Sequence, residues 1–319
     1  MSRKWKRRLL VLLGLVLVGF ALLNLLAYRH AHAMMYFTAD GSRTRQAEDL
    51  GLADKIGVLF SGIKLPRPET ALALASLGPA WQSVTINCTN GIRLGAWYCA
   101  GSRPGQLVIL FHGYAGEKSG VLGEANAFLE MDQAVLLVDF RGSGESSESY
   151  TTIGFREGED VASAFRYAQE HLSPSRVILY GQSMGAAAAL RAIHSDGIKP
   201  DAIILEAVFD RLLTTAQNRF AIMGLPSFPA AQLLIFWGGW QAGFNGFSHN
   251  PIDYAASVQC PVLFLHGTDD PRAKLQDARR VFAAVTTTKT FKEFQGMGHR
   301  GGLGAFPDEW KEAVSNFLK

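Results

Sequence analysis

The sequence predicts an α/β protein with one mostly parallel central sheet that helices cover on both faces. From Trp81 onward, short apolar runs alternate with segments of helical periodicity, as expected of parallel strands joined by crossover helices. The 319 residues are 48% hydrophobic, which is enough for the core of one large domain and excludes disorder as the main state. We expect buried strands at 107–113, 134–140, 176–183, 202–209, 261–267 and 290–296, and helices near 119–131, 157–172, 184–194, 272–285 and 307–318.

A hairpin over the segment SVTINCTNGIRLGAWYC is predicted to begin this sheet. Asn90-Gly91 is a dipeptide that tolerates the positive φ angles of a tight turn. A turn centred there makes Cys88 face Arg93 and not Cys99, so we expect no disulfide between these two cysteines. Together with Cys260, the cysteines are too few and too scattered for a disulfide framework or a zinc site.

Residues 1–28 are predicted to form a membrane anchor. A cationic cluster between Arg3 and Arg8 precedes the apolar run at 9–27, in which Asn24 is the one polar residue. A helix of that length spans about 28 Å, close to the hydrocarbon thickness of a bilayer. The cluster predicts a cytoplasmic N-terminus, with the rest of the chain in the periplasm or outside the cell. The alternative is a signal peptide cleaved near Ala31-His32-Ala33, which would give a secreted protein.

The basic residues are concentrated in the predicted anchor. Residues 1–33 hold six of the 31 lysines and arginines and no acid, which leaves 25 basic against 28 acidic residues in the remainder. The net charge of +3 therefore belongs to the anchor, and the remainder carries a formal charge of −3. Because no strong basic excess is present, we expect no nucleic-acid partner.

Two segments lie outside the regular alternation of strands and helices. Residues 29–80 read as a connector with an amphipathic helical stretch at 47–60, and residues 81–319 as the main folded domain. Residues 210–258 interrupt that domain as a cap-like helical insertion. Its aromatic residues can line an apolar acyl pocket, contact the bilayer interface, or belong to a helix packed on the sheet. They are Phe236, Trp237, Trp240 and Phe244.

The strongest chemical signal is Gly181-Gln182-Ser183-Met184-Gly185, between the predicted strand RVILY and the helical segment AAAALRA. A nucleophile on a sharp turn from strand to helix needs small neighbours, because the backbone there packs against adjacent chain. Gly181 and Gly185 supply that room. The serine would also lie at a helix N-terminus, where the helix dipole favours developing negative charge. Ser183 is therefore the candidate nucleophile.

A serine hydroxyl needs a histidine base and an acid that orients it. His299 lies in a glycine-rich loop after the last predicted strand, and Asp269 and Asp270 follow the strand PVLFL. Asp139 and Asp210 also follow strands and suit structural roles. Two other histidines, His112 and His266, precede a glycine at a strand end, and the remaining five are expected at the surface: His30, His32, His171, His194 and His249.

With these motifs in the order Ser, Asp, His, residues 81–319 resemble the α/β-hydrolase superfamily, in particular its serine-aminopeptidase-like and monoacylglycerol-lipase-like branch with membrane-anchored members. HGYAG at 112–116, DFRGSGES at 139–146, GQSMG, HGTDD and GMGHRG stand where that family carries its motifs. The resemblance implies the α/β-hydrolase fold. It also implies Ser183 as nucleophile, Asp270 as the acid and His299 as the base.

The same resemblance implies that the backbone amides of Tyr114 and Met184 form the oxyanion hole. The chain departs from the family after the acid, where PRAK replaces the usual Val-Pro pattern, so the shape of the loop after Asp270 is not implied.

These features predict a membrane-tethered serine hydrolase that cleaves carboxylic esters of lipids or small molecules. A serine peptidase is the alternative, because the same triad cleaves amides, although no acidic residue lies between Asp210 and Asp253 to bind a cationic amino terminus. A non-catalytic binding protein on the same fold is a further alternative. We expect no metal and no cofactor, because the zinc-protease, P-loop and dinucleotide-binding motifs are missing from the sequence. The sequence does not determine the oligomeric state.

Overall fold

The computed structural model describes residues 3–89, 91–102 and 105–319. Within them, eight strands form one sheet in the order β1-β2-β4-β3-β5-β6-β7-β8. β1 pairs antiparallel with β2 and β2 with β4, whereas all other pairs are parallel. The strands are β1 (Trp81–Asn87), β2 (Arg93–Cys99), β3 (Gln106–Phe111), β4 (Ala134–Val138), β5 (Arg176–Gln182), β6 (Ala202–Glu206), β7 (Val262–Gly267) and β8 (Lys289–Phe294).

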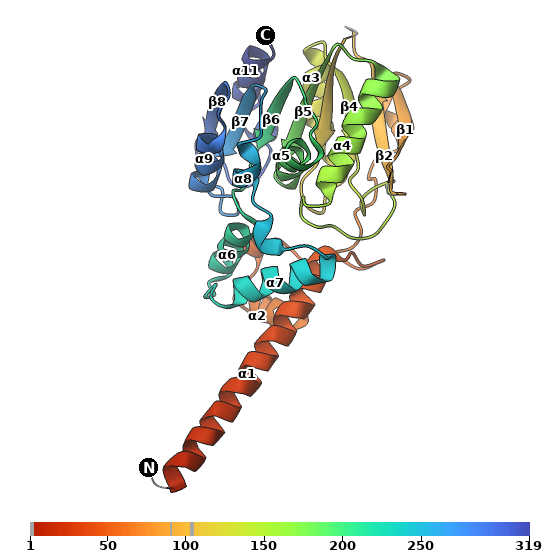
Figure 1. Ribbon diagram of the computed structural model, residues 1–319. Coiled ribbons are helices and arrows are strands. Elements are labelled where there is room, and N and C mark those ends of the chain that lie inside the picture. The colour runs from red at the N-terminus through yellow and green to blue at the C-terminus, as the bar shows by residue number, and fades with distance from the viewer. Residues whose placement is uncertain (1–2, 90, 103–104) are drawn as a thin grey trace.

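Helices cover both faces of this sheet, as the sequence predicts (Figure 1). α4 and α5 lie on one face, and α3 and α11 on the other. The helices are α1 (Arg3–Met35), α2 (Leu52–Ser61), α3 (Leu122–Glu130), α4 (Glu157–Tyr167), α5 (Met184–Asp196), α6 (Leu212–Met223), α7 (Ala230–Ala242), α8 (Pro251–Ala255), α9 (Leu275–Ala284), α10 (Gly302–Ala305) and α11 (Pro307–Leu318).

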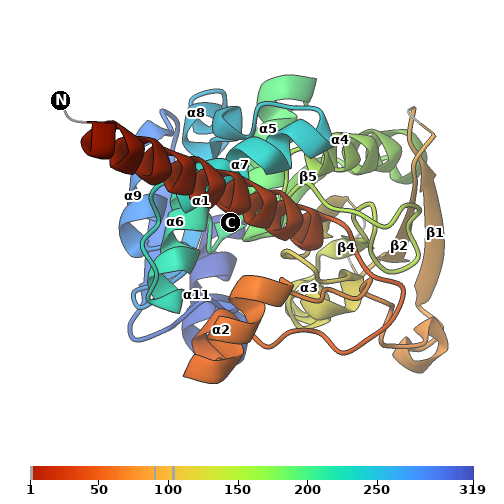
Figure 2. The same cartoon turned by 90° about the horizontal axis from the view of Figure 1, so that it is seen from below.

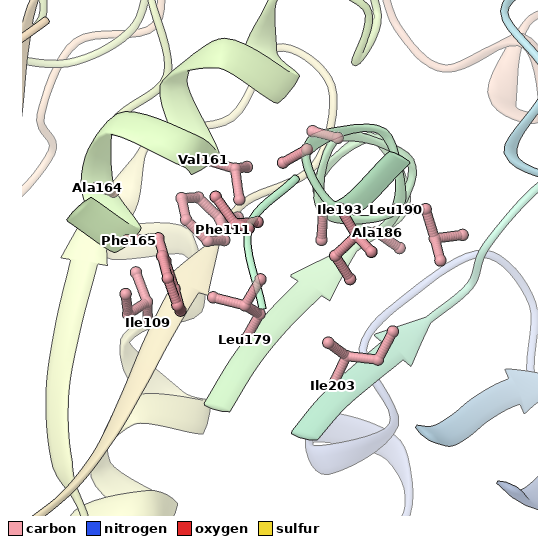
Figure 3. Packing of buried hydrophobic residues seen from close by; sticks show 14 of the residues in the cluster. Ile109, Phe111, Val161, Ala164, Phe165, Leu179, Ala186, Leu190, Ile193 and Ile203 are labelled. Atoms are coloured by element: carbon pink, nitrogen blue, oxygen red, sulfur yellow. The ribbon is translucent and has the colours of Figure 1, made fainter. Parts of the chain in front are cut away.

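Alternate residues of the central strands fill two cores, because successive side chains of a strand point to opposite faces. On one face, Ile109 and Leu179 pack against Phe165 of α4 and Leu190 of α5 (Figure 3). On the other face, side chains such as Leu110 pack with Phe128 of α3 and Trp310 of α11. This double burial explains why the central parallel strands read as continuous apolar runs. β8, predicted as buried, is a partly exposed edge strand in which Phe294 is the one buried residue.

The first helix is longer than the predicted anchor and has two different halves. Its N-terminal half projects away from the domain (Figure 1), and residues such as Leu10 and Leu22 are 68% and 56% exposed. From Leu23 onward the helix packs on the domain, where Ala27, Ala31 and Met35 are buried. By length and composition α1 is suited to cross a membrane or to act as a signal sequence.

The polar residue within the apolar run lies where the two halves meet. Trp237 of α7 donates a hydrogen bond from Nε1 to Oδ1 of Asn24 at 3.1 Å, and the Tyr28 ring packs edge-on against Trp237. Gln241 of α7 donates to the Tyr28 carbonyl at 3.0 Å. α7 therefore holds the second half of α1 against the domain, and Figure 2 shows α1 lying across it.

Two local predictions are wrong. Asn87 pairs with Arg93 in the hairpin, so Cys88 lies opposite Ile92 and not Arg93, and the three cysteines are free. The predicted turn residue Asn90 lies outside the described residues. His249 is fully buried instead of lying at the surface, because its ring bonds to the Ile153 carbonyl and the Tyr254 hydroxyl. Burial lowers the pKa of His249 to about 4.

A buried ion pair fixes the loop after β4. Lys118 Nζ lies 2.6 Å from Asp139 Oδ2, and both side chains are fully buried. The Asp139 carboxylate also accepts the backbone N–H groups of Lys118 and Glu145. Gly144 completes this turn at a φ of +49°, since a Cβ there would lie 2.0 Å from Asp139 Oδ2. Asp139 is thus structural.

Replacement of Lys118 by alanine is expected to destabilise the fold by about 3–5 kcal/mol, because it leaves the Asp139 carboxylate buried without its cation. Lys311→Ala is the matched control, since Lys311 forms an exposed ion pair with Glu130 at 2.7 Å and should cost less than about 1 kcal/mol. Denaturant unfolding of the detergent-solubilised protein measures both. Equal losses of stability would contradict the structural role of the buried pair.

Candidate active site

The turn between β5 and α5 presents Ser183 at the carboxyl edge of the sheet. Ser183 has a φ of +52°, in a region that residues other than glycine rarely adopt. The flanking glycines permit this turn: a Cβ on Gly181 would lie 2.5 Å from the Gly185 backbone, and one on Gly185 would lie 2.5 Å from the Phe111 carbonyl. The turn thus projects the serine side chain beyond the end of β5.

The structure brings Ser183 and His299 together. The Oγ of Ser183 lies 3.1 Å from Nε2 of His299, although the two residues are 116 positions apart. The His299 side chain is 16% exposed, so its ring remains accessible from the cavity described below. The loop after β8 carries His299, and the following Gly302 begins α10.

Asp270 completes this arrangement, and Asp269 does not. The Nδ1 of His299 lies 2.7 Å from Oδ2 of Asp270, whose side chain is fully buried. The other oxygen, Oδ1, accepts the backbone N–H groups of Arg272 and Ala273 at 2.8 and 2.9 Å. Asp269 is exposed and bonds to the neighbouring Thr268 hydroxyl. These bonds hold the Asp270 carboxylate in one orientation toward the imidazole.

The remaining acid candidate, Asp210, is held in an ion-pair cluster. Asp210 pairs with Arg211 and with Arg280 at 3.1 and 2.9 Å. Asp270, and not Asp210, is therefore the acid that contacts His299.

The two predicted oxyanion donors flank the serine. Met184 follows Ser183 as the first residue of α5, and Tyr114 follows Gly113, where a Cβ would lie 3.8 Å from the Ser183 Cβ. His112 anchors that second segment: its Nδ1 bonds to the Gly113 carbonyl at 2.8 Å, and its Nε2 accepts the Phe140 N–H at 3.1 Å. Burial lowers the pKa of His112, which keeps the ring neutral for this pairing.

A buried glutamate that the sequence analysis missed connects the serine and histidine loops. The Glu206 carbonyl accepts the Ser183 N–H at 2.7 Å, and the Glu206 carboxylate accepts the Gly302 N–H, three residues after His299. Tyr180 and Trp310 also donate to this carboxylate. Glu206 ends the apolar run AIILE, and a charged residue in such a run needs hydrogen-bond partners if it is buried. This position was the signal in the sequence for a buried polar network.

A cavity of about 550 Å³ opens onto the serine and histidine. Besides Ser183 and His299, its lining contains Tyr114, four arginines and one carboxylate among the described residues. The arginines are Arg43, Arg219, Arg272 and Arg300, and the carboxylate is Glu124. Arg272 pairs with Glu48 at 2.6 Å. These charged side chains give the cavity a polar wall with an excess of positive charge.

The aromatic residues of the insertion do not line this cavity. Phe236 and Trp240 are 49% and 64% exposed, Trp237 packs on α1, and Phe244 stacks on Phe155 with ring centroids 3.9 Å apart. Of the three roles considered for these residues, lining a pocket at the serine is therefore the one that the structure does not support. Because α7 is apolar on all sides, its sequence does not show which side faces the site.

Comparison with known proteins places this architecture in a family. Residues 106–229 match the model of the family described as alpha/beta hydrolase fold. The esterase Pf2001 of Pyrococcus furiosus superposes with a TM-score of 0.67 at 22% identity, over 79% of this chain and 96% of the esterase. The chain thus has the α/β-hydrolase fold, as the motifs predicted, and the match at 106–229 supports the predicted superfamily. The narrower branch stays a prediction.

Two sequence relatives extend the comparison. A protein of Mycobacterium tuberculosis described as uncharacterized is 28% identical over 243 residues, or 74% of this chain and 79% of the relative. Lysophosphatidylserine lipase ABHD12 of Macaca fascicularis is 24% identical over 215 residues, or 62% of this chain and 50% of the lipase. At the level of the superfamily, these similarities support a hydrolase.

The cavity carboxylate Glu124 has an unusual protonation equilibrium. Its side chain is 7% exposed, and desolvation, with a smaller effect of the nearby Glu206, raises its pKa to about 7. The folded state therefore favours the protonated acid. Below pH 4.5 both states are protonated, and as the pH rises toward 7 the unfolded chain ionises first, so wild-type stability falls over that interval.

Glu124→Gln is expected to remove this pH-dependent loss of folding stability, which is on the order of 3 kcal/mol. The melting temperature of the variant relative to wild type should therefore be higher at pH 8 than at pH 5. Glu130→Gln, at the exposed end of the same helix, serves as the control. A Glu124→Gln difference that is the same at both pH values would show that this carboxyl is not responsible.

Proposed function

We propose that the protein is a membrane-tethered serine hydrolase that cleaves carboxylic esters through an acyl-enzyme intermediate. The observation that carries the proposal is the continuous relay from Ser183 Oγ to His299 Nε2 at 3.1 Å and from His299 Nδ1 to Asp270 Oδ2 at 2.7 Å. In this relay the imidazole accepts the serine proton as Oγ attacks the acyl carbonyl. The same imidazole then returns the proton to the leaving alcohol.

The surroundings of the relay support its proposed roles. Asp270 receives the Nδ1–H of His299, which leaves Nε2 as the proton acceptor toward serine. The N-terminus of α5 and the proposed backbone amides of Tyr114 and Met184 stabilise the negative charge that develops on the carbonyl oxygen. Water then attacks the acyl-enzyme, with His299 acting as base, and releases the acid.

The charge of the cavity favours an ester over a peptide with a free amino terminus. A cationic α-amino group would enter a cavity lined by four arginines, and burial already shifts its one carboxylate, Glu124, toward the neutral form. A neutral or anionic alcohol group meets no such repulsion. Esterases and a lipase among the similar proteins agree with this choice.

The contacts of α1 support a retained anchor. Cleavage near Ala31-His32-Ala33 would remove Ala27 and Ala31, which are 7% and 3% exposed because the domain covers them. It would also remove the Asn24 side chain that bonds to Trp237. We propose that the N-terminus is cytoplasmic and that the catalytic domain lies at the opposite membrane surface, as the cationic cluster indicates.

Ser183→Ala is expected to lower kcat/KM for a short p-nitrophenyl ester by about 10⁴-fold and to abolish labelling by a fluorophosphonate. Ser175→Ala is the matched control, because Ser175 is exposed just before β5, at the opposite end of the strand from Ser183. The control variant should retain wild-type activity. Ester hydrolysis that survives in Ser183→Ala would overturn the assignment, and faster cleavage of aminoacyl amides than of esters would favour a peptidase.

A further inference from the structure

A second cavity, almost entirely apolar, lies beside the catalytic cavity. Its volume is about 190 Å³, and it is enclosed by α1, α2, α6, α7 and the segment around residues 43–50. Most of the exposed wall is aliphatic: Leu23, Leu26 and Ala27 come from α1, Val58 from α2, Met223 from α6 and Leu234 from α7. His30, Arg45 and Lys64 also contribute to the lining. Segments far apart in the sequence, near the start of the chain and in the insertion at 210–258, thus build one apolar space.

The two cavities share a wall at the catalytic centre. Arg43, Gln46, Tyr114 and Arg219 line both of them, and we call these four residues the neck. The hydroxyl of Tyr114 donates a hydrogen bond to the Met34 carbonyl at 2.5 Å, near the end of α1. The apolar cavity therefore begins at the residue whose backbone amide is proposed to bind the oxyanion.

From the neck, the apolar cavity runs along α1 toward its projecting half. Its lining includes both Met34 and Leu23, which are separated by about 16 Å along a helix. Leu22, the residue before Leu23, is 56% exposed and belongs to the segment suited to a bilayer. The cavity thus extends from the catalytic centre to the point at which α1 leaves the domain.

The surface of the domain around the point where α1 leaves it is also apolar. Leu52, Ile56 and Phe60 of α2 are 77%, 53% and 65% exposed, and Phe236 and Trp240 of α7 are 49% and 64% exposed. Figures 1 and 2 show α2 and α7 beside α1 at the end of the domain from which α1 projects. Exposed aromatic and aliphatic side chains beside a membrane helix are suited to the bilayer interface.

The charge of Arg219 at the neck indicates which end of a substrate would lie there. The Arg219 guanidinium stacks over the Tyr114 ring at 5.5 Å, and no hydrogen bond or ion pair joins it to another residue in the described part of the chain. Burial lowers the pKa of Arg219. A half-buried cation favours polar ligand atoms or water beside it, so the ester group belongs at the neck and the hydrocarbon tail at the Leu23 end.

We propose that α1 is a wall of the substrate site as well as a tether. A single acyl chain of a bilayer lipid occupies the cavity between α1, α2, α6 and α7, with its tail near Leu23 and its ester carbonyl at Ser183. The chain reaches this cavity from the bilayer beside α1, and the polar cavity receives the alcohol. This inference rests on the proposed ester hydrolase function, since Ser183 must attack an acyl carbonyl.

Two neighbouring leucines of α1 provide the test. Leu26 lines the cavity, whereas Leu25 is 55% exposed and does not. In the full-length protein in nanodiscs, Leu26→Trp should fill the cavity and lower the ratio of kcat/KM for p-nitrophenyl dodecanoate to that for p-nitrophenyl acetate by about tenfold or more. Leu25→Trp should leave this ratio within about twofold of wild type. Equal ratios for the two variants would overturn the proposal.

A second variant tests the same cavity in case Leu26→Trp does not fold. Leu234→Trp fills the same cavity from α7 and should lower the ratio in the same direction. Fluorophosphonate labelling of Ser183 reports whether each variant retains a folded catalytic domain. Labelled variants with an unchanged ratio count against an acyl chain in this cavity.

The two proposals fail in different ways. If wild type hydrolyses neither ester and a fluorophosphonate does not label Ser183, the hydrolase proposal fails. If wild type hydrolyses both esters through Ser183 and both cavity variants keep its chain-length ratio, only the role of α1 fails.

Discussion

The sharp turn at Ser183 is the constraint on which the rest of the site depends. Ser183, a residue with a Cβ, adopts a φ of +52°, and the Gly185 backbone and the Phe111 carbonyl leave no room for a Cβ at the flanking glycines. This turn projects Oγ beyond the carboxyl edge of a parallel sheet, where the loops after β7 and β8 also end. Asp270 and His299 therefore reach the serine from strands on the same side of β5.

Much of the fold and the grouping of Ser183, Asp270 and His299 was predictable, because both depend on local patterns. The apolar runs gave the central strands, and Ser183, Asp270 and His299 stand in short motifs with defined places after strands. Glu206, Glu124 and Arg219 were not predicted, since their roles depend on packing between distant segments. The burial of His249 was misjudged for the same reason, and the sequence left open which side of α7 is exposed.

Helix α1 joins the proposed membrane attachment to the proposed chemistry. Its second half is held by Trp237 and Gln241 of α7, and its end accepts a hydrogen bond from Tyr114. The helix that α7 holds against the domain is thus also in contact with the residue proposed to bind the oxyanion. This arrangement gives a physical reason for a tether at this position: an acyl chain leaving the bilayer along α1 meets the apolar cavity before it meets water.

Photocrosslinking with a long-chain alkyl fluorophosphonate that carries a diazirine at the chain end tests the central claim most directly. After labelling in membranes and irradiation, peptide mass spectrometry should find the phosphonate on Ser183. The diazirine crosslink should lie on cavity-lining residues at the far end, such as Leu23 or Leu26 of α1. Phosphonylated Ser183 with crosslinks confined to surfaces outside this cavity would contradict the account, as would labelling of another nucleophile.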